Sequence, residues 1–580
     1  MIRLVFSVLL ALLVMGGSTA LAQDTTRTAL PDIAPKEVEI RGQLEISLPS
    51  LRRQPLVGFN PPPRITEIPA GRRPFIERYK QESIDLPPSP LQPPQPPEVS
   101  SLANRIPFTG TLDGGLGTYL HRFGNAHIGL PMGLSGTLNL KAKYRGQQGD
   151  QPFDNDRRNQ YDRFSGLLGY EQVAPGAIWG IEGDFGSHAL NLYGADVLTG
   201  NGNDEPTRTI NTGGGAFYLR ALPTALTQYD VRVAFGGTSI GTTPTQTIGT
   251  NESASYGEQR FALDGSLTLP FGTNAFVADA EMVTSSLDDV LIADNSFAGV
   301  STAGMLRLRP TPQAEINLGG RFMSDRSTAR GVAGEEEARP YFAPIAQVLY
   351  YPQQGVRVYA QTLPSATLHS FREMTEVNPY IVPRPRLEAS IRTVDAEAGA
   401  DVFVGALRFK GFAGYQLAPN YRFFEVATQR ERDIYSQGFS AARYERASIF
   451  HGGAEVSAAL PQGVYGRLST VIRRARLTDA DTVIPYVSPF EVRAQLSYLF
   501  DRQRGLLQVG SSFHGRRYID RNETVRVGDY FDLDIEASYM FTPTMGVLVQ
   551  AGNLSIDALR YYDRYPITPF VVTGGFRFRW

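Results

Sequence analysis

From Thr109 onward, apolar and polar residues alternate with period two, in segments that turn-forming residues separate. In residues 531–541 the odd positions are aromatic or aliphatic, and Asp532, Asp534 and Glu536 lie between them. Residues 490–500 follow the same pattern, with Arg493 among the polar positions. Successive side chains of a β-strand point to opposite faces, so the pattern predicts strands with one apolar and one polar face. Several carboxylates on one face indicate that this face meets water.

The links between these segments are of two kinds, which alternate along the chain. The short links are residues 174–175, 222–226, 270–273, 309–312, 351–355, 461–463, 501–504 and 542–545. The long polar segments are residues 148–160, 194–211, 241–256, 285–296, 324–339, 363–386, 479–488, 517–528 and 555–568. A β-sandwich has no reason to sort its links in this way. The sequence therefore predicts an all-β fold, a transmembrane antiparallel β-barrel of about 22 strands (range roughly 16–22) with short periplasmic turns and long extracellular loops.

The N-terminal residues predict the compartment. Arg3 is followed by an apolar run over residues 4–15 and by small residues that end at Ala22, a pattern that predicts a signal peptide over residues 1–22. The chain has no cysteine to carry a lipid, and beyond residue 22 it contains no apolar stretch long enough for a membrane helix. With 58 Gly, 27 Tyr, 32 Phe and 20% charged residues, the composition favours a barrel in the lipids of the outer membrane of a Gram-negative bacterium. A net charge of −2 gives no reason to expect a nucleic-acid partner.

Residues 23–104 differ from the rest, which leaves residues 105–580 for the barrel. Seven prolines lie within residues 86–97, and three more follow one another at residues 61–63. Prolines at this density favour extended polyproline II over a packed core. The segment is therefore predicted to be a proline-rich periplasmic tail or linker, and a flexible linker without a partner is an equal alternative.

The last residues carry the most specific local pattern. Phe576, Phe578 and the terminal Trp580 alternate with Arg577 and Arg579, so the chain ends on an outward-facing aromatic residue. This resembles the C-terminal strand that the barrel-assembly machinery recognises, in which a terminal Phe is usual. We expect the three aromatic residues to form that signal.

The closing stretch resembles the end of TonB-dependent receptor barrels. The resemblance rests on Asn553-Leu554, the tyrosine-rich residues 560–566 and the aromatic last strand. It implies a 22-stranded barrel. Residues 36–42, with Glu37, Val38, Ile40 and Gly42, are similar to the short motif by which such receptors contact a TonB-type energising protein. Only about 65 residues separate this motif from the first strand, too few for a plug of ordinary domain size, roughly 100 to 150 residues. The resemblance therefore implies a barrel with a truncated or missing gate.

No catalytic or metal site stands out from the sequence. The six histidines lack metal-ligand spacing, and there is no thiolate, so no cofactor is implied. Ser512 and His514 would suit an outer-membrane hydrolase, yet strand periodicity alone places both on one face. Function is therefore expected in the lumen. Its predicted inward charges are of mixed sign and include Arg493, Arg516, Asp532, Asp534, Glu536, Arg577 and Arg579.

Three hypotheses follow from these observations. The first is a transport protein, a passive or partner-gated channel for solutes, and not an enzyme. The second is a structural or assembly barrel that anchors the tail, whose polyproline II segments bind a periplasmic partner protein. The third is the hydrolase. Arg516 is expected to pair with Asp532 or Asp534 across neighbouring strands.

Overall fold

The structure is a computed structural model that describes residues 109–133, 135–149, 158–195, 207–243, 254–288, 295–327, 337–382, 385–427, 438–554, 560–562, 564–568 and 570–580. The signal peptide predicted for residues 1–22 and the tail predicted for residues 23–104 lie outside the described residues. So do Glu37, Val38, Ile40 and Gly42 of the candidate energy-coupling motif.

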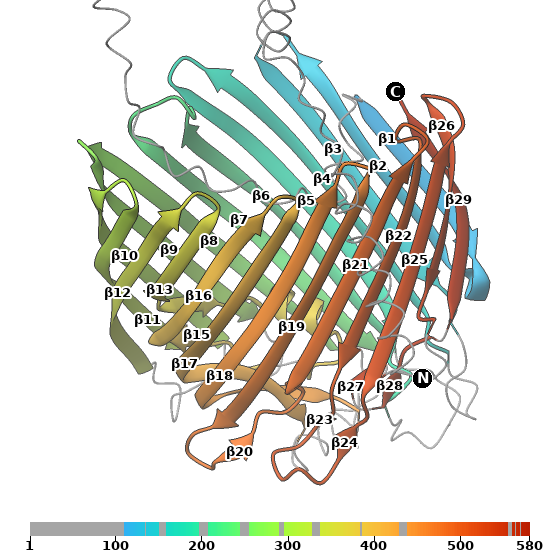
Figure 1. Ribbon diagram of the computed structural model, residues 1–580. Coiled ribbons are helices and arrows are strands. Elements are labelled where there is room, and N and C mark those ends of the chain that lie inside the picture. The colour runs from blue at the N-terminus through green and yellow to red at the C-terminus, as the bar shows by residue number, and fades with distance from the viewer. Residues whose placement is uncertain are drawn as a thin grey trace, which may run out of the picture. The chain divides into compact units, whose positions relative to one another are not determined.

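Twenty-two antiparallel strands of the described residues form one closed barrel (Figure 1). In chain order they are β1 (Gly110–Gly117), β2 (Arg122–Met132), β3 (Gly136–Gln147), β4 (Tyr161–Ala174), β5 (Ala177–Asn191), β6 (Thr207–Ala221), β7 (Gln228–Thr243), β8 (Ala254–Phe271), β9 (Asn274–Asp288), β10 (Asn295–Thr311), β11 (Ala314–Ser327), β12 (Glu337–Gln353), β13 (Val356–Thr362), β16 (Val394–Val404), β17 (Leu407–Val426), β18 (Ser440–Leu460), β19 (Val464–Leu477), β21 (Phe490–Phe500), β22 (Gly505–His514), β25 (Tyr530–Met540), β26 (Met545–Gly552) and β29 (Val571–Arg579). Each strand pairs with the next along the chain, and β29 pairs with β1 to close the ring. The expected fold and strand number are confirmed.

The links are sorted by length between the two ends of the barrel. Residues 175–176, 272–273, 312–313 and 354–355 are two-residue turns at one end, and the described parts of the long links lie at the other. These long links carry the short strands β20 (Thr482–Val483), β23 (Arg517–Tyr518), β24 (Arg526–Val527), β27 (Arg560–Tyr562) and β28 (Tyr565–Pro566), at the lower end in Figure 1. Several strands extend beyond the expected segments: β9 continues to Asp288 and β12 begins at Glu337, inside segments that were predicted as polar loops.

The seam between the first and last strands depends on small residues. Gly115 of β1 lies opposite Gly575 of β29, and each has a further glycine beside it in its own strand, Gly114 and Gly574. A Cβ atom at Gly115 or Gly575 would collide with the opposite backbone. The glycines thus permit the close approach of the two strands. On the inner face of the seam, the Arg577 guanidinium donates to both carboxylate oxygens of Asp113 at 2.8 and 3.1 Å.

Helical structure is sparse in the described part of the chain. A 3-10 turn (Thr118–Leu120) links β1 and β2, and the one α-helix there, α5 (Phe371–Val377), lies in the link between β13 and β16. Neither is long or apolar enough to cross a bilayer.

Candidate functional site in the lumen

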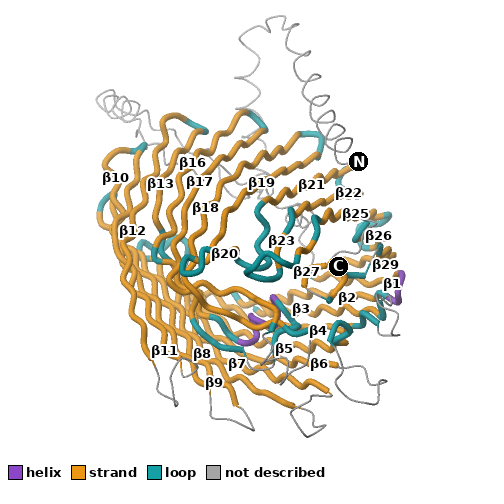
Figure 2. The backbone as a smooth tube through the Cα atoms, turned by 90° about the horizontal axis from the view of Figure 1, so that it is seen from below, coloured by secondary structure: helices purple, strands orange, loops and turns teal. Residues whose placement is uncertain are grey.

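Residues 363–382 and 385–393, between β13 and β16, run into the interior of the barrel, and we call them the lumen segment. They contain β14 (Ser365–Leu368), α5 and β15 (Ala389–Arg392). Figure 2 shows α5 inside the ring of strands. The sequence predicted an outer polar loop over residues 363–386. That expectation was wrong, because the segment has an apolar side that packs inward.

Local sequence explains the short helix. The Ser370 side chain accepts a hydrogen bond from the Glu373 backbone N–H at 3.1 Å, and the Glu373 carboxylate accepts from the Ser370 N–H at 3.4 Å. This capping box satisfies two backbone donors that the first turn leaves free. Phe371 and Met374, three residues apart on one face of the helix, are fully buried. The helix ends at Val377, and Asn378 is its C-cap.

An apolar core inside the barrel holds the lumen segment. From the segment, Phe371, Met374, Ile381, Leu387 and Ile391 are fully buried or nearly so. They pack within one cluster against side chains from the long-link ends of several strands, namely Ile210, Ile240, Val283, Phe297 and Met323. A barrel interior is ordinarily polar, so this patch marks where the segment docks. Burial stabilises by about 1.5–3 kcal/mol for each such side chain, so these contacts stabilise the docked position of the segment.

Two charged residues of the wall bind the backbone of the segment. The buried Glu258 of β8 accepts hydrogen bonds from the N–H groups of Phe371 and Arg372, at 2.8 and 3.1 Å. The fully buried Arg208 of β6 donates from Nη1 to the carbonyl oxygens of Pro379 and Ile381, at 2.6 and 2.8 Å. Both residues lie on the arc of wall that faces the segment, so they fasten it across the lumen.

His369, just before the helix, is buried and neutral. Arg422 donates to its Nδ1 at 3.1 Å. Burial lowers the pKa of the imidazole to about 3, with help from the positive charges of Arg422 and Arg392. Protonation of this ring is therefore opposed by the docked position of the segment.

Tyrosines fix the far end of the segment to other long links. The Tyr380 ring stacks on Tyr565 with centroids 3.5 Å apart, and Tyr193 meets Tyr565 edge-on at 5.2 Å. Burial raises the pKa of Tyr380 to about 12. Aromatic pairs add to the free energy of apolar burial, so these contacts strengthen the constriction.

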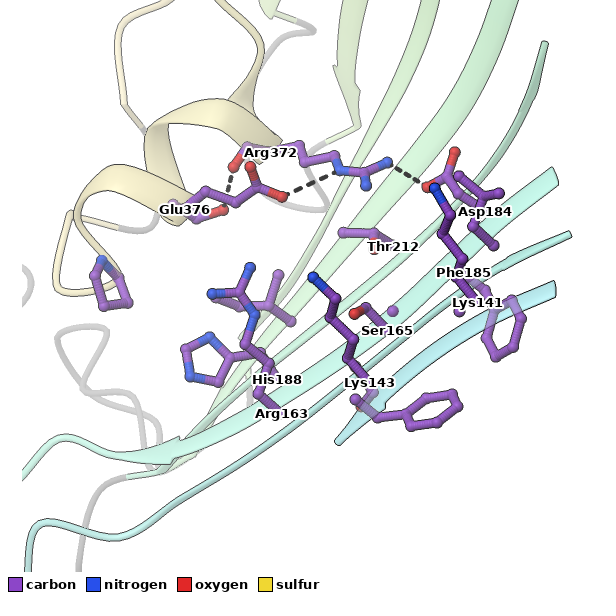
Figure 3. A pocket seen from close by; sticks show the side chains of 18 residues that line it. Lys141, Lys143, Arg163, Ser165, Asp184, Phe185, His188, Thr212, Arg372 and Glu376 are labelled. Carbon is purple, nitrogen blue, oxygen red and sulfur yellow. Dashed lines mark hydrogen bonds and ion pairs between the residues drawn. The ribbon is translucent and has the colours of Figure 1, made fainter. Parts of the chain in front are cut away.

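A cavity of about 450 Å³ lies between α5 and the inner wall formed by β3 to β6. Figure 3 shows Lys143 and Arg163 on the wall side, below the helix, and Lys141 to the right of them. From the helix, Arg372 reaches Asp184 of β5 at 2.6 Å and Glu376 at 3.4 Å. The cavity is thus charged and lies where the segment narrows the lumen.

A second cavity, of about 250 Å³, lies between the helix and β5 to β8 and is of mixed sign. Arg232 pairs with Glu182 at 2.8 Å, and Arg260 lies 3.5 Å from Glu373. Among the residues that the structure describes, no group of three or more His, Cys, Asp or Glu side chains is arranged to hold a metal ion.

The structure places the aromatic residues of the expected assembly signal on the closing strand. Phe576, Phe578 and Trp580 are exposed on the outer face. The Trp580 backbone exchanges two hydrogen bonds with Gly110, at 3.0 and 3.1 Å, and so continues the seam. Arg579 shares the inner face with Arg577 by strand alternation.

The other predicted lumen charges are dispersed along β21, β25 and their links. Arg493 lies 3.4 Å from Glu491 and is largely exposed, while Glu536 accepts from Gln550 at 3.3 Å. Asp532 and Asp534 face Ser512 and Gly510 in the strand register. They form no common site with the lumen segment in the described residues.

The pairing expected for Arg516 was wrong. Its Nε lies 3.6 Å from the Asp529 carboxylate, because β22 ends at His514 and Arg516 belongs to the following link. The His514 ring stacks on Tyr530 at 4.4 Å, and its Nδ1 lies 3.5 Å from Glu491. The imidazole is therefore engaged by neighbouring strands rather than turned toward Ser512.

Sequence reasoning missed the residues that build the constriction. Lys141, Lys143 and Arg163 do alternate on polar strand faces, which is a usable signal. Arg208 was expected in the polar loop over residues 194–211, and Glu258 lies two residues beyond the polar loop expected over residues 241–256. Nothing in the local sequence distinguishes either residue from a solvated charge. Only their contacts with a segment more than a hundred residues away reveal their role.

Neither a protein-family model nor a curated protein sequence matches the chain. Solved structures do match. The FrpB iron transporter from Neisseria meningitidis has a TM-score of 0.64 and 8% identity, with 82% of each chain covered. The copper transporter OprC has a TM-score of 0.60 and 10% identity, over 81% of this chain and 80% of that one. A ferric enterobactin receptor mutant from Pseudomonas aeruginosa has a TM-score of 0.64 and 10% identity, over 81% of each. At these identities the likeness shows the fold alone: the chain has a barrel similar to those of these transporters and this receptor.

Proposed function

We propose that the chain is an outer-membrane transport protein, a passive or partner-gated channel in which the lumen segment forms the constriction. The observation that carries the proposal is the docking of the lumen segment inside a closed barrel with a charged lumen. A barrel that serves only as a membrane anchor does not need a helix bound inside its lumen. A channel does, because the constriction sets which solutes pass.

The structural neighbours support a transport role in general terms. Their titles name iron and copper transporters and a ferric enterobactin receptor. The cargo of this chain is a separate question. A TonB-type energising protein is a candidate partner through residues 36–42, and the barrel-assembly machinery through the last strand. The alternative is a barrel that anchors a tail for a periplasmic partner. That function needs no path for solutes, so it would be favoured if the lumen segment closes the lumen completely.

Planar-bilayer conductance of the refolded full chain tests the proposal, with and without residues 23–104. Steady conductance in both forms supports an open channel with a tethered tail. Conductance only after the deletion assigns the gate to the tail. Silence in both forms refutes the channel and favours the anchor. A third form, with residues 369–388 replaced by a short Gly-Ser link, is expected to conduct more than the full chain because its constriction is gone.

A further inference from the structure

The inner wall beside α5 carries a concentration of positive charge. Lys141 and Lys143 of β3 lie on the same face, two residues apart, and Arg163 follows on the neighbouring strand β4. The strand register sets Lys143 opposite Ser165, two residues from Arg163 on the same face. Like charges so close on adjacent strands destabilise a sheet unless something compensates them.

These three cations are not compensated within the described residues. Elsewhere on the inner wall, Arg321 pairs with Asp279 at 2.8 Å, and Arg577 pairs with Asp113 at the same distance. Lys141, Lys143 and Arg163, in contrast, form no ion pair or side-chain hydrogen bond with any described part of the chain. The wall here differs from the sites of those two pairs, where each cation has a carboxylate partner.

The helix does not supply the missing negative charge. Asp184 and Glu376, the two carboxylates that line the cavity, both bind Arg372 of the helix. Four cationic side chains therefore line the cavity against two carboxylates, and those two are already engaged by one of the four. Figure 3 shows Lys143 and Arg163 directed into the space below the helix.

The cavity has the size and the donors of a binding site. Its volume of about 450 Å³ falls within the usual range for small ligands. Ser165 and Thr212 add hydroxyl groups to the lining, and both can donate hydrogen bonds. Ammonium, guanidinium and hydroxyl donors together match the oxygens of phosphate or carboxylate groups.

We propose that this cavity is a binding site for a small, multiply charged anion that bears phosphate or carboxylate groups. The site selects such solutes at the constriction. The selection of passing solutes rests on the proposed channel function, whereas the binding itself does not. Occupancy by the anion removes the repulsion between the cations of β3 and β4.

Titration calorimetry of the full chain in detergent, with sodium pyrophosphate as the probe and citrate as a second one, tests the binding site. The test variant carries Lys143→Gln and Arg163→Gln. The control variant carries Arg467→Gln and Arg493→Gln, which removes the same charge from β19 and β21, outside the cavity lining. We expect pyrophosphate to bind the parent and the control alike, and the test variant at least about tenfold more weakly.

A charge-conserving variant, Lys143→Arg with Arg163→Lys, is expected to bind within a few-fold of the parent. It keeps the proposal testable if the neutral variant fails to form the heat-modifiable band of a folded barrel. The proposal is overturned if the parent does not bind millimolar pyrophosphate or citrate, if the test variant binds as the parent does, or if the control loses binding equally.

Conductance separates this inference from the proposed function. Reversal potentials in a KCl gradient are expected to show anion preference in the parent, reduced in the test variant only. Binding without conductance would refute the channel and leave the anion site in place. Conductance with a reversal potential that the test variant does not change would refute the selecting role of the site and leave the channel in place.

Discussion

Arg208 is expected to fasten the lumen segment, and the substitution Arg208→Met tests this. The guanidinium is fully buried and donates to the carbonyl oxygens of Pro379 and Ile381 at 2.6 and 2.8 Å. Methionine keeps most of the apolar stem and removes the donors. Both carbonyl groups are then left without that partner while the segment stays docked.

The magnitude follows from these two bonds. Leaving a buried acceptor without its donor costs about 1–3 kcal/mol, so two acceptors cost about 2–6 kcal/mol. The cost disappears when the segment opens and water reaches the carbonyl groups. The lower bound, about 2 kcal/mol, corresponds to an increase of about thirtyfold in the equilibrium constant for opening.

Thiol labelling measures the opening directly, because the chain has no cysteine of its own. Thr375→Cys places one thiol on the helix at a position that is 2% exposed. When closing outpaces the chemistry, the labelling rate is proportional to the equilibrium constant for opening. We therefore expect maleimide to label Arg208→Met at least about thirtyfold faster than the parent that carries Thr375→Cys alone.

The matched control is Arg220→Met, on the same strand at the other end. Arg220 pairs with Glu171 at 2.6 Å and lies far from the segment along β6. Its labelling rate should equal that of the parent. An unchanged rate in Arg208→Met, or an equal increase in Arg220→Met, would refute the fastening role.

Three further outcomes are expected. Docking lowers the pKa of His369 to about 3, so the docked state is stabilised fully above pH 6.5, and this contribution is lost as the pH falls from 6.5 toward 3. With Thr375→Cys in both proteins, the labelling rate of the parent divided by that of His369→Gln at the same pH should be about thirtyfold higher at pH 5 than well above pH 6.5, because the comparison at equal pH cancels the slower reaction of the thiol in acid. An unchanged ratio would contradict the role of His369. Arg577→Ala leaves the Asp113 carboxylate without its partner at the seam, which costs about 3 kcal/mol of stability. The band of the folded barrel in SDS gels should therefore disappear at a lower temperature than in the parent. An unchanged temperature would contradict the role of this ion pair. Replacing the exposed Phe578 and Trp580 by Ser removes two of the three aromatic residues of the proposed assembly signal. The fraction of the protein that resists urea extraction from outer membranes should then fall several-fold. An unchanged fraction would show that these two residues are not part of the signal.

Much of the barrel is readable from the sequence because its signals are local. Alternation with period two predicts strands such as β21 and β25. The short links at residues 175–176 and 354–355 contain glycine, a turn-forming residue, at the position where the chain reverses. Closure into a ring follows from the need to satisfy every backbone group in lipid. The strand ends were underestimated, because β9 and β12 continue into polar sequence where hydrogen bonding to their neighbours outweighs composition.

The candidate site depended on tertiary structure. A polar loop and an infolded segment contain similar residues, and burial of Phe371 and Met374 is decided by apolar side chains from distant strands. Arg372 and Asp184 are 188 residues apart, and no spacing rule connects them. The sequence by itself determined a membrane barrel with a charged interior, since alternation is set by the geometry of one strand. Only the tertiary structure decided which charges are paired, which are left facing a cavity and what narrows the lumen, because these depend on contacts between strands on opposite sides of the ring.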